Sequence, residues 1–206
     1  MGYCVTAFAV GLGKINEAIG SRNKPLLNLL IEEFEEDFDQ YDQMAANYVE
    51  DEDPDSALTM RGALTQMVMG DAYNERLGFM YGYALEFLCR HFGEFLPNRQ
   101  WSAMPSGCDW ADTVDRGLDR AGVPKNILRV SWHLINRGPP IAIPEIDDFP
   151  GIGYVKRSEV EAARMSLANA RLDAIQNDEV LSSVQELQGW LQKCSDSGVD
   201  LLCFLA

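Results

Sequence analysis

The segment YCVTAFAV, from Tyr3 to Val10, decides how this chain has to fold. It is rich in β-branched and aromatic residues, which favour extended backbone, so it predicts a strand. The other end of the chain holds a similar apolar segment, VDLLCFL, from Val199 to Leu205. A lone strand leaves its backbone groups unpaired and is not stable in water. The two ends are therefore expected to pair in one sheet, which makes residues 1–206 a single α+β domain.

Most of the chain between these strands has the periodicity of helices. The longest predicted helix begins near Pro25, a residue that is favoured in a first turn. Its apolar stripe consists of Leu27, Leu30, Ile31, Phe34, Phe38, Tyr41, Ala45 and Tyr48. Other helices are predicted at residues 14–19, 56–69, 75–95, 110–121, 158–176 and 178–197. The pattern indicates a mainly helical domain with a small sheet.

Two more strands are predicted in the second half of the chain. Apolar residues alternate with polar ones from Leu128 to Leu134, which is typical of a strand with one buried face and puts His133 on the polar face. Residues 141–143 lie between prolines and suit the edge of a sheet. The segment from Asp147 to Tyr154 is interpreted as an irregular connection. Ser158 and Glu161 are interpreted as the capping box of the following helix.

The stretch from Glu32 to Asp55 carries twelve of the 32 acidic residues, and the whole chain has a formal net charge of −15. No Lys or Arg occurs between Pro25 and Met60. Neighbouring carboxylates on a helix repel each other by a few tenths of a kcal/mol per pair, and nothing nearby in the sequence offsets that repulsion. A strongly acidic chain argues against nucleic acid and anionic membranes as partners. It favours a basic protein.

The five cysteines have scattered spacings and mostly apolar neighbours. This pattern indicates reduced, buried thiols in a reducing compartment, and we expect a cytoplasmic protein. The N-terminus lacks the basic and long apolar regions of a signal peptide. No apolar run approaches the roughly 20 residues that a membrane-spanning helix needs.

No catalytic motif stands out in the sequence. Gly11-Leu12-Gly13-Lys14 lies between a predicted strand and a predicted helix, where a phosphate loop would lie. It lacks the third glycine of the dinucleotide-binding pattern and the Gly-Lys-Ser/Thr ending of a P-loop. Gly151-Ile152-Gly153 has the same shortcoming, so both are interpreted as turns. The two histidines and the cysteines show no zinc-binding spacing. The acidic loop residues Glu145, Asp147 and Asp148 are interpreted as solvated, and no cofactor or metal is predicted.

Both ends of the chain resemble known proteins. The opening Met1-Gly2-Tyr3 and the closing Trp190-Leu191, Gly198 and Leu201–Leu205 resemble uncharacterised bacterial proteins that include the YfbM-like family. The segments YGYALE (81–86) and DDFPGIGY (147–154) resemble a narrower set of related bacterial proteins over most of the chain. The resemblance implies an α+β fold with paired terminal strands, and it carries over no active-site residues.

These observations favour a non-catalytic acidic binding protein. The concrete hypothesis is an immunity protein that neutralises a basic toxin, because nuclease toxins that bind phosphates are themselves basic. The aromatic residues Tyr41, Tyr48, Tyr73 and Trp101 are candidate anchors for the partner. The carboxylates expected to bind it are Glu35, Glu36, Asp39, Asp42, Glu50, Asp51, Glu52 and Asp53.

Three alternatives stay open at this level. The acidic run can be no more than a solvated face, which is the commoner role of such runs. The chain can be an enzyme acting on a small molecule in a pocket made by His133, Asp147, Asp148 and Tyr154. It can also be a housekeeping or regulatory module without a strong partner. The sequence decides neither the identity of a partner nor the oligomeric state.

Overall fold

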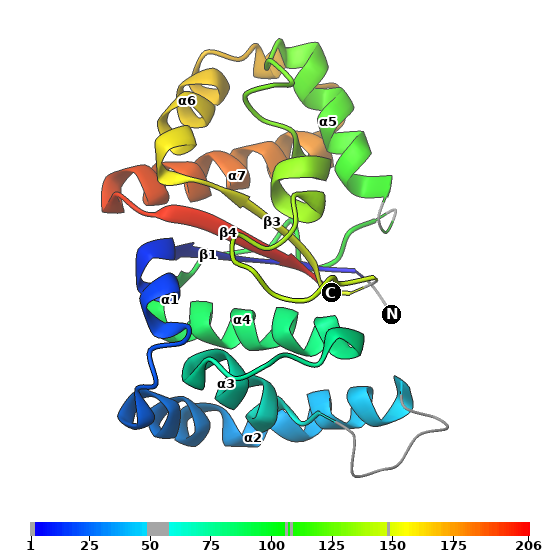
Figure 1. Ribbon diagram of the computed structural model, residues 1–206. Coiled ribbons are helices and arrows are strands. Elements are labelled where there is room, and N and C mark those ends of the chain that lie inside the picture. Colours follow the sequence, from blue (N-terminus) through cyan, green and yellow to red (C-terminus); the bar gives the residue numbers. More distant parts are fainter. Residues whose placement is uncertain (1–2, 49–57, 106, 108, 148) are drawn as a thin grey trace. The chain divides into compact units, whose positions relative to one another are not determined.

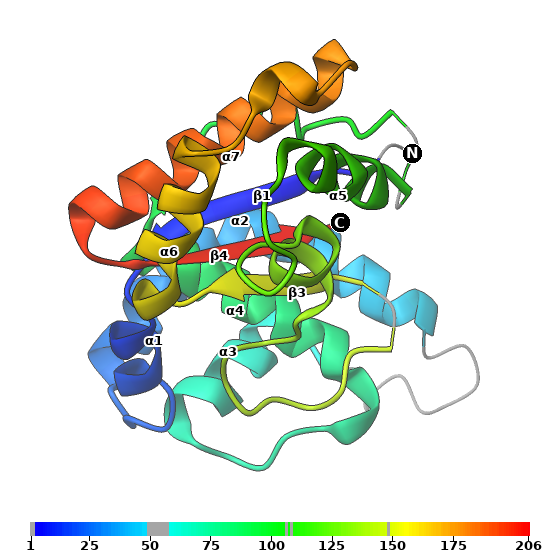
Figure 2. The same cartoon turned by 90° about the horizontal axis from the view of Figure 1, so that it is seen from above.

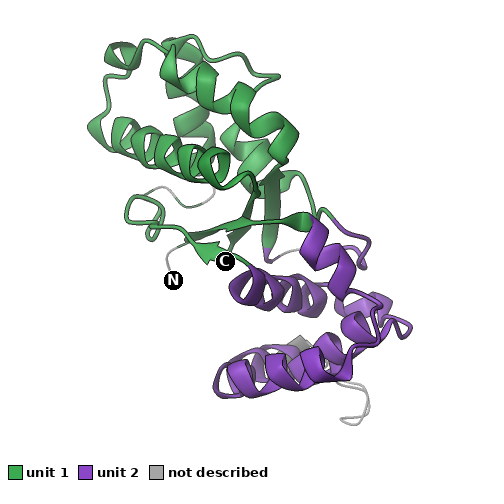
Figure 3. Cartoon of the chain, turned by 90° about the vertical axis from the view of Figure 1, so that its left-hand side faces the viewer, with its two compact units in different colours: residues 1–12, 93–140, 151–206 green, residues 13–92, 141–150 purple. Residues whose placement is uncertain are grey.

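The computed structural model describes residues 3–48, 58–105, 107, 109–147 and 149–206 (Figure 1). The chain forms two compact units (Figure 3): unit 1 comprises residues 1–12, 93–140 and 151–206, and unit 2 comprises residues 13–92 and 141–150. The fold is α+β and mainly helical, as predicted, with a four-stranded sheet. The expectation of one domain over residues 1–206 stays a prediction.

Unit 1 contains the whole sheet. Its strands are β1 (Val5–Val10), β2 (Glu94–Phe95), β3 (Gly151–Val155) and β4 (Asp200–Leu205), in the order β2-β1-β4-β3. The two central strands come from the two ends of the chain, because β1 pairs antiparallel with β4 from Val5↔Leu205 to Val10↔Asp200. The predicted pairing of the terminal strands is therefore confirmed.

Three helices of unit 1 lie on one face of this sheet (Figures 1 and 2). They are α5 (Asp109–Ala121), α6 (Arg157–Ala168) and α7 (Asp178–Ser197). The longest, α7, packs against both central strands through the apolar stripe that its periodicity predicts, with Val184, Leu187 and Leu191 fully buried. Asn177 caps α7 at its start, and Gly198, with φ 64°, ends it. A short 3-10 turn, Leu172–Ala174, separates α6 from α7, where the sequence predicts one helix to residue 176.

The carboxylate of Asp200 binds the first backbone N–H of two helices. Its Oδ2 accepts a hydrogen bond of 2.9 Å from the backbone N of Leu12, where α1 (Leu12–Ala18) begins. Its Oδ1 accepts one of 2.8 Å from the backbone N of Arg157, where α6 begins. The first N–H groups of a helix have no partner within the helix, and a negative charge there is favourable. The place of a phosphate after Gly11 is thus taken by a carboxylate of the chain itself.

We expect the Asp200→Asn substitution to lower the free energy of unfolding by about 1–3 kcal/mol, because it weakens two charge-assisted hydrogen bonds. Urea denaturation measures this. The control is Asp196→Asn, an exposed residue nearby that accepts a bond only from the Gln192 side chain and should change stability by less than about 0.5 kcal/mol. Equal effects of the two substitutions would contradict the role given to Asp200.

The predicted strand at residues 128–134 is wrong. The chain forms a π-helical turn, η3 (Ser131–Asn136), in which His133 is buried rather than exposed on a polar face. The alternation misled because Leu128, Val130 and Leu134 are buried, as in a strand, while Trp132 is half-exposed. Asp115 closes the start of the turn, since its carboxylate accepts bonds from the backbone N of Val130 and Ser131.

The segment interpreted as an irregular connection holds the real edge strand, β3, and residues 141–143 form none. The two glycines of Gly151-Ile152-Gly153 let η3 approach this strand closely. A Cβ on Gly153 would lie 2.3 Å from the carbonyl carbon of Leu134, and one on Gly151 would lie 3.2 Å from the backbone O of Ile135. These glycines therefore serve packing, and the segment is neither a turn nor a phosphate loop.

Three other predicted boundaries are corrected. The helix predicted at 75–95 is the short turn η2 (Glu75–Leu77) followed by α4 (Gly78–Phe92), and residues 94–95 belong to the sheet. The cap of α6 is made by Glu159, whose carboxylate accepts from the backbone N of Lys156 at 2.9 Å, rather than by Ser158 and Glu161. The helix α3 (Met60–Met69) is capped by Thr59, whose hydroxyl accepts a hydrogen bond from the backbone N of Gly62.

In unit 2, α3 packs on both α4 and the long helix α2 (Lys24–Tyr48). Residues of the segment 141–150 pack closely against two glycines that lie one turn apart on α4. A Cβ on Gly78 would lie 1.9 Å from the backbone O of Glu145, and one on Gly82 would lie 2.8 Å from Cδ1 of Ile146. A Cβ on Gly82 would also lie 3.0 Å from Cγ of Pro150, so the segments 81–86 and 147–154, which carry the narrower resemblance, meet at this glycine.

We expect Gly153→Ala to destabilise the protein by about 3 kcal/mol or more, because the added methyl group meets rigid backbone. Thermal denaturation measures the change. The matched control is Gly189→Ala, in the exposed middle of α7 with no atom within 4 Å of the new Cβ. This control should stabilise the protein by up to about 1 kcal/mol, since alanine is the better helix former. A neutral Gly153→Ala would contradict the close packing of η3 on β3.

Candidate functional site

The acidic helix α2 is the strongest candidate for a binding site that the sequence offers. One face of this helix is buried in unit 2. Phe34 and Phe38 are buried, and their rings contact Phe87 of α4 at centroid distances of 4.9 and 5.7 Å. Leu30 and Ala45 continue the stripe. The apolar periodicity read from the sequence is therefore confirmed, and it determines which carboxylates face outward.

Neighbouring helices neutralise part of the acidic run. Two ion pairs and one histidine–carboxylate contact, all within unit 2, connect α2 to α3 and α4. They are Glu35–Arg61, Asp37–Arg90 at 2.9 Å and Glu33–His91 at 2.6 Å. The repulsion that no nearby residue offsets is thus relieved in part by Arg61 and Arg90, which come from distant parts of the sequence.

The carboxylate of Asp42 has a structural role and is not available to a partner. Its Oδ1 accepts a hydrogen bond of 2.6 Å from the backbone N of Met60, the first residue of α3. A carboxylate at that position satisfies one of the unpaired N–H groups at a helix start. Asp42 therefore connects α2 to α3, and its carboxylate is already engaged.

Glu32, Glu36 and Asp39 are exposed, and they form no ion pair or hydrogen bond with the described residues. Their spacings of four and three residues place them in one row on the helix surface. We call these three residues the acidic ridge. Only Glu36 and Asp39 of the ridge are among the predicted partner-binding residues. Glu32 was omitted from that set, although its helical spacing from Glu36 could have included it.

Of the other predicted partner-binding residues, Glu35 is paired but exposed, and four are not described. Glu35 pairs with Arg61 while its side chain stays 66% exposed. Glu50, Asp51, Glu52 and Asp53 lie outside the described residues, as does the predicted cap at Asp53-Pro54.

Three of the four predicted aromatic anchors are packed at least partly inside, and the side chain of the fourth, Tyr48, lies outside what the structure describes. Trp101 is fully buried, and its indole N donates to the backbone O of Ser183 at 3.3 Å, so its assignment as an exposed anchor is wrong. Tyr41 and Tyr73 are half-buried against the rings of Tyr83 and Tyr81, respectively. These two tyrosines stabilise contacts between elements of unit 2 rather than projecting freely into solvent.

Charge is distributed unequally between the units. Unit 2 carries 19 acidic and 6 basic residues, whereas unit 1 carries 13 and 11. Nearly all of the net charge of −15 therefore belongs to unit 2, the unit that contains the acidic ridge. A field of this size raises the local concentration of a cationic partner and speeds its association at low salt.

The residues of the predicted enzyme pocket are divided between the units. His133 and Tyr154 belong to unit 1, Asp147 belongs to unit 2, and Asp148 lies outside the described residues. Burial, more than the nearby Arg137, lowers the pKa of His133, whose Nδ1 lies 3.0 Å from the backbone N and O of Arg129. The enzyme hypothesis stays a prediction.

Arg137 connects this part of unit 1 through several contacts. Its guanidinium binds the Glu159 carboxylate in bidentate fashion at 2.6 and 2.8 Å and donates to the backbone O of Tyr154 at 2.9 Å. It also lies over the Tyr154 ring, 4.1 Å from the centroid. The backbone O of Ile152 accepts from Gly138, so both outward carbonyls at this edge of β3 are covered. The arrangement protects the sheet edge.

We expect Glu159 to make stability fall in acid. The hydrogen bonds from Arg137 lower the pKa of Glu159 from 4.5 to about 2, so its contribution is present above pH 4.5 and is lost as the pH falls toward 2. Glu159→Gln should be less stable than the unmodified protein at pH 6, and the difference should disappear near pH 2. Urea denaturation across this range measures it. A difference that persists unchanged at pH 2 would contradict the assignment.

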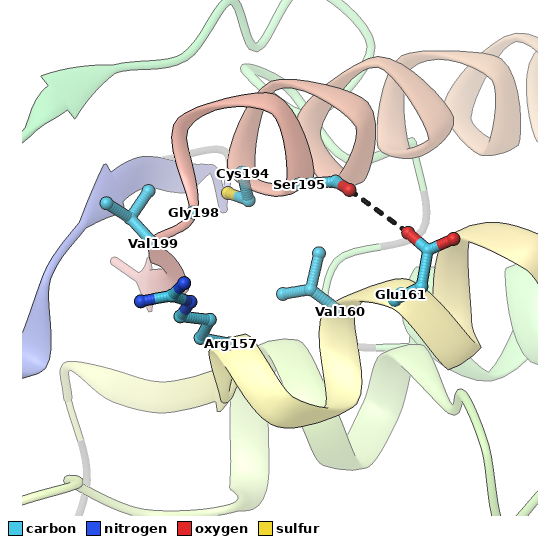
Figure 4. A pocket seen from close by; sticks show the side chains of 7 residues that line it. All are labelled: Arg157, Val160, Glu161, Cys194, Ser195, Gly198 and Val199. Carbon is cyan, nitrogen blue, oxygen red and sulfur yellow. Dashed lines mark hydrogen bonds between the residues drawn. The ribbon is translucent and has the colours of Figure 1, made fainter.

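A hollow of about 290 Å³ lies between α6 and the end of α7 (Figure 4). Ser195 donates to the Glu161 carboxylate at 3.0 Å, and Arg164 binds the same carboxylate. Burial raises the pKa of the Cys194 thiol to about 12, which makes it a poor nucleophile. The residues lining it are Arg157, Val160, Glu161, Cys194, Ser195, Gly198 and Val199, and none belongs to the predicted pocket.

Two other kinds of site are absent from the described residues. Among them, no group of three or more His, Cys, Asp or Glu side chains could hold a metal ion. None of their helices combines the length and apolar character needed to cross a membrane. Cys89, Cys194 and Cys203 are buried, as predicted, whereas Cys4 is half-buried.

Comparison with known proteins gives one match. No curated protein and no solved structure is significantly similar to this chain. The model of a family described as a domain of unknown function, DUF7691, matches residues 1–206. The chain therefore belongs to the DUF7691 family of domains of unknown function.

Proposed function

We propose that this protein is a non-catalytic acidic binding protein that receives a basic protein on the acidic ridge of α2. The observation that supports the proposal is the state of Glu32, Glu36 and Asp39. The other described acids of α2 bind Arg61, Arg90, His91 or the start of α3, whereas these three have no partner among the residues that the structure describes. They therefore remain available to a cation from another molecule.

The internal pairs make the ridge a better binding surface. They hold α2 against α3 and α4, so the three carboxylates are presented on a fixed helix instead of a flexible tail. A preformed surface loses less conformational entropy when it binds a partner. The charges at its rim would mainly raise the association rate and make binding sensitive to salt.

Neutralisation of a toxin is the specific form of this proposal. A toxin that acts on nucleic acid needs a basic surface for phosphates, and an acidic inhibitor can mask that surface. An immunity protein of this kind would act in the bacterial cytoplasm, in keeping with the resemblance to YfbM-like proteins. That kinship, the cytoplasmic location and the toxin are parts of the proposal.

The test compares three proteins as baits in extracts of the source cell. The ridge variant carries Glu32→Gln, Glu36→Gln and Asp39→Asn. The control removes three exposed charges from unit 1 through Asp112→Asn, Asp173→Asn and Asp196→Asn. We expect the unmodified protein and the control to capture the same basic protein, with at least tenfold less on the ridge variant and release by salt.

Folding is checked independently. The ridge variant should be as stable as the unmodified protein or slightly more so, because three like charges on one helix are removed. A ridge variant that folds and still captures the same basic proteins would overturn the proposal, as would the absence of any basic protein from all three captures.

The immunity form needs a second measurement. Expression of the captured basic protein in a host should reduce growth, and co-expression of this chain should restore it, while the ridge variant should restore it much less. A captured protein that is harmless to the host would refute toxin neutralisation and leave binding at the ridge as a separate result.

A further inference from the structure

The hollow between α6 and the end of α7 carries one charge of each sign in its lining (Figure 4). Of the seven residues that line it, two are charged, and both Arg157 and Glu161 belong to the first turns of α6. The lining also contains the apolar side chains of Val160 and Val199. All of these residues belong to unit 1, so the hollow is separate from the acidic ridge of unit 2.

The guanidinium of Arg157 has no carboxylate of its own. Its side chain forms no hydrogen bond or ion pair with the described residues. Glu161, one turn further along α6, has the spacing of a partner. Its carboxylate is instead bound by Arg164 at 2.7 and 2.9 Å and by the Ser195 hydroxyl at 3.0 Å. Asp200 binds the backbone N of Arg157 rather than its side chain. The fold therefore leaves one cation unpaired at the hollow.

Gly198 determines where this cation lies. It ends α7 with φ 64°, and a Cβ at this position would lie 3.5 Å from both Cζ and Nη2 of Arg157. The absence of a side chain thus gives the guanidinium its place in the wall of the hollow. In Figure 4 the guanidinium and the Glu161 carboxylate lie to either side of Val160. The unpaired cation and the Glu161 carboxylate therefore line different sides of the hollow.

The side of the hollow at Glu161 and Ser195 offers hydrogen-bond acceptors. Ser195 uses its hydroxyl hydrogen on Glu161, so its Oγ keeps lone pairs that can accept. A carboxylate has about four acceptor sites, and the described residues use three of those on Glu161. A group that binds on this side must therefore bring N–H or O–H donors.

We propose that this hollow binds a short linear ω-amino acid. The ligand's carboxylate binds the Arg157 guanidinium in bidentate fashion, which is the favoured geometry of this pair. Its ammonium group donates to Ser195 and Glu161, and its hydrocarbon chain lies between them along Val160. A ligand with one charge of each sign matches the lining. The volume of about 290 Å³ is at the lower end of the range for small-molecule sites, about 300–1,000 Å³, and suits a ligand of this size.

The first experiment is an NMR titration of the unmodified protein with four matched probes. In 4-aminobutyrate the charged groups are at the two ends of the chain, and in its isomer 2-aminobutyrate they are adjacent. Butyrate and butylamine each lack one of them. We expect 4-aminobutyrate to shift the Gly198 and Val199 amide resonances and to bind at least about fivefold more tightly than the other three, because one partly exposed charged contact is worth up to about that factor.

Two results of this titration would overturn the proposal. One is the absence of saturable shifts up to about 50 mM 4-aminobutyrate, well above the millimolar dissociation constants of weak sites. The other is binding of 4-aminobutyrate no tighter than that of butyrate, butylamine or 2-aminobutyrate. Both results need only the unmodified protein to be folded.

Substitution of Arg157 tests the anionic end of the ligand. Arg157→Gln should weaken 4-aminobutyrate and butyrate alike by about fivefold, and Arg157→Lys should have an intermediate effect, because lysine keeps the charge but not the bidentate fork. The matched control is Arg171→Gln, which changes an exposed arginine of unit 1 that does not line the hollow. An equal loss of binding in Arg171→Gln would refute the site.

Substitution of Ser195 tests the cationic end. Ser195→Ala should weaken 4-aminobutyrate and leave butyrate unchanged, since butyrate brings no donor to this side of the hollow. Circular dichroism checks that each variant is folded. The variant that lacks the acidic ridge should bind 4-aminobutyrate as the unmodified protein does, so failure of one proposal leaves the other standing. Equal weakening of butyrate and 4-aminobutyrate in Ser195→Ala would contradict the orientation of the ligand.

Discussion

The antiparallel pairing of β1 with β4 is the constraint on which unit 1 depends. It joins residues that are almost the whole chain apart in sequence, and Cys4 and Ala206 extend it by two further backbone hydrogen bonds. At the other end of the pair, the Asp200 carboxylate holds the starts of two helices. One residue at the start of β4 thus satisfies the first backbone N–H of both α1 and α6.

In unit 2 the equivalent constraint is electrostatic as well as apolar. The stripe of α2 buries phenylalanines against Phe87 of α4, and this fixes which carboxylates point outward. Helices α3 and α4 then supply Arg61, Arg90 and His91 to the acids along the border of that stripe. The charge run therefore has two parts, of which one stabilises unit 2 internally and the acidic ridge remains outside these pairs. That division makes a binding role physically reasonable for the three carboxylates of the acidic ridge.

Several features could not be read from local sequence. Alternating burial from Leu128 to Leu134 is compatible with a strand, and only the close approach of Gly153 to the backbone of η3 shows why a π-helical turn forms there. The Gly-x-Gly at residues 151–153 has the composition of a turn, yet it forms a strand because another segment needs the space that side chains would occupy. Trp101 lies in a polar loop by sequence and is buried by contacts with α7, 82 residues away along the chain.

The sequence by itself determined the α+β class, the helical periodicity, the pairing of the two terminal strands and the acidic character, because these depend on local propensity and on the few ways in which apolar strands can be satisfied. The tertiary structure decided which acids are free. Whether a carboxylate is neutralised depends on cations brought from α3 and α4, and no spacing within α2 contains that information.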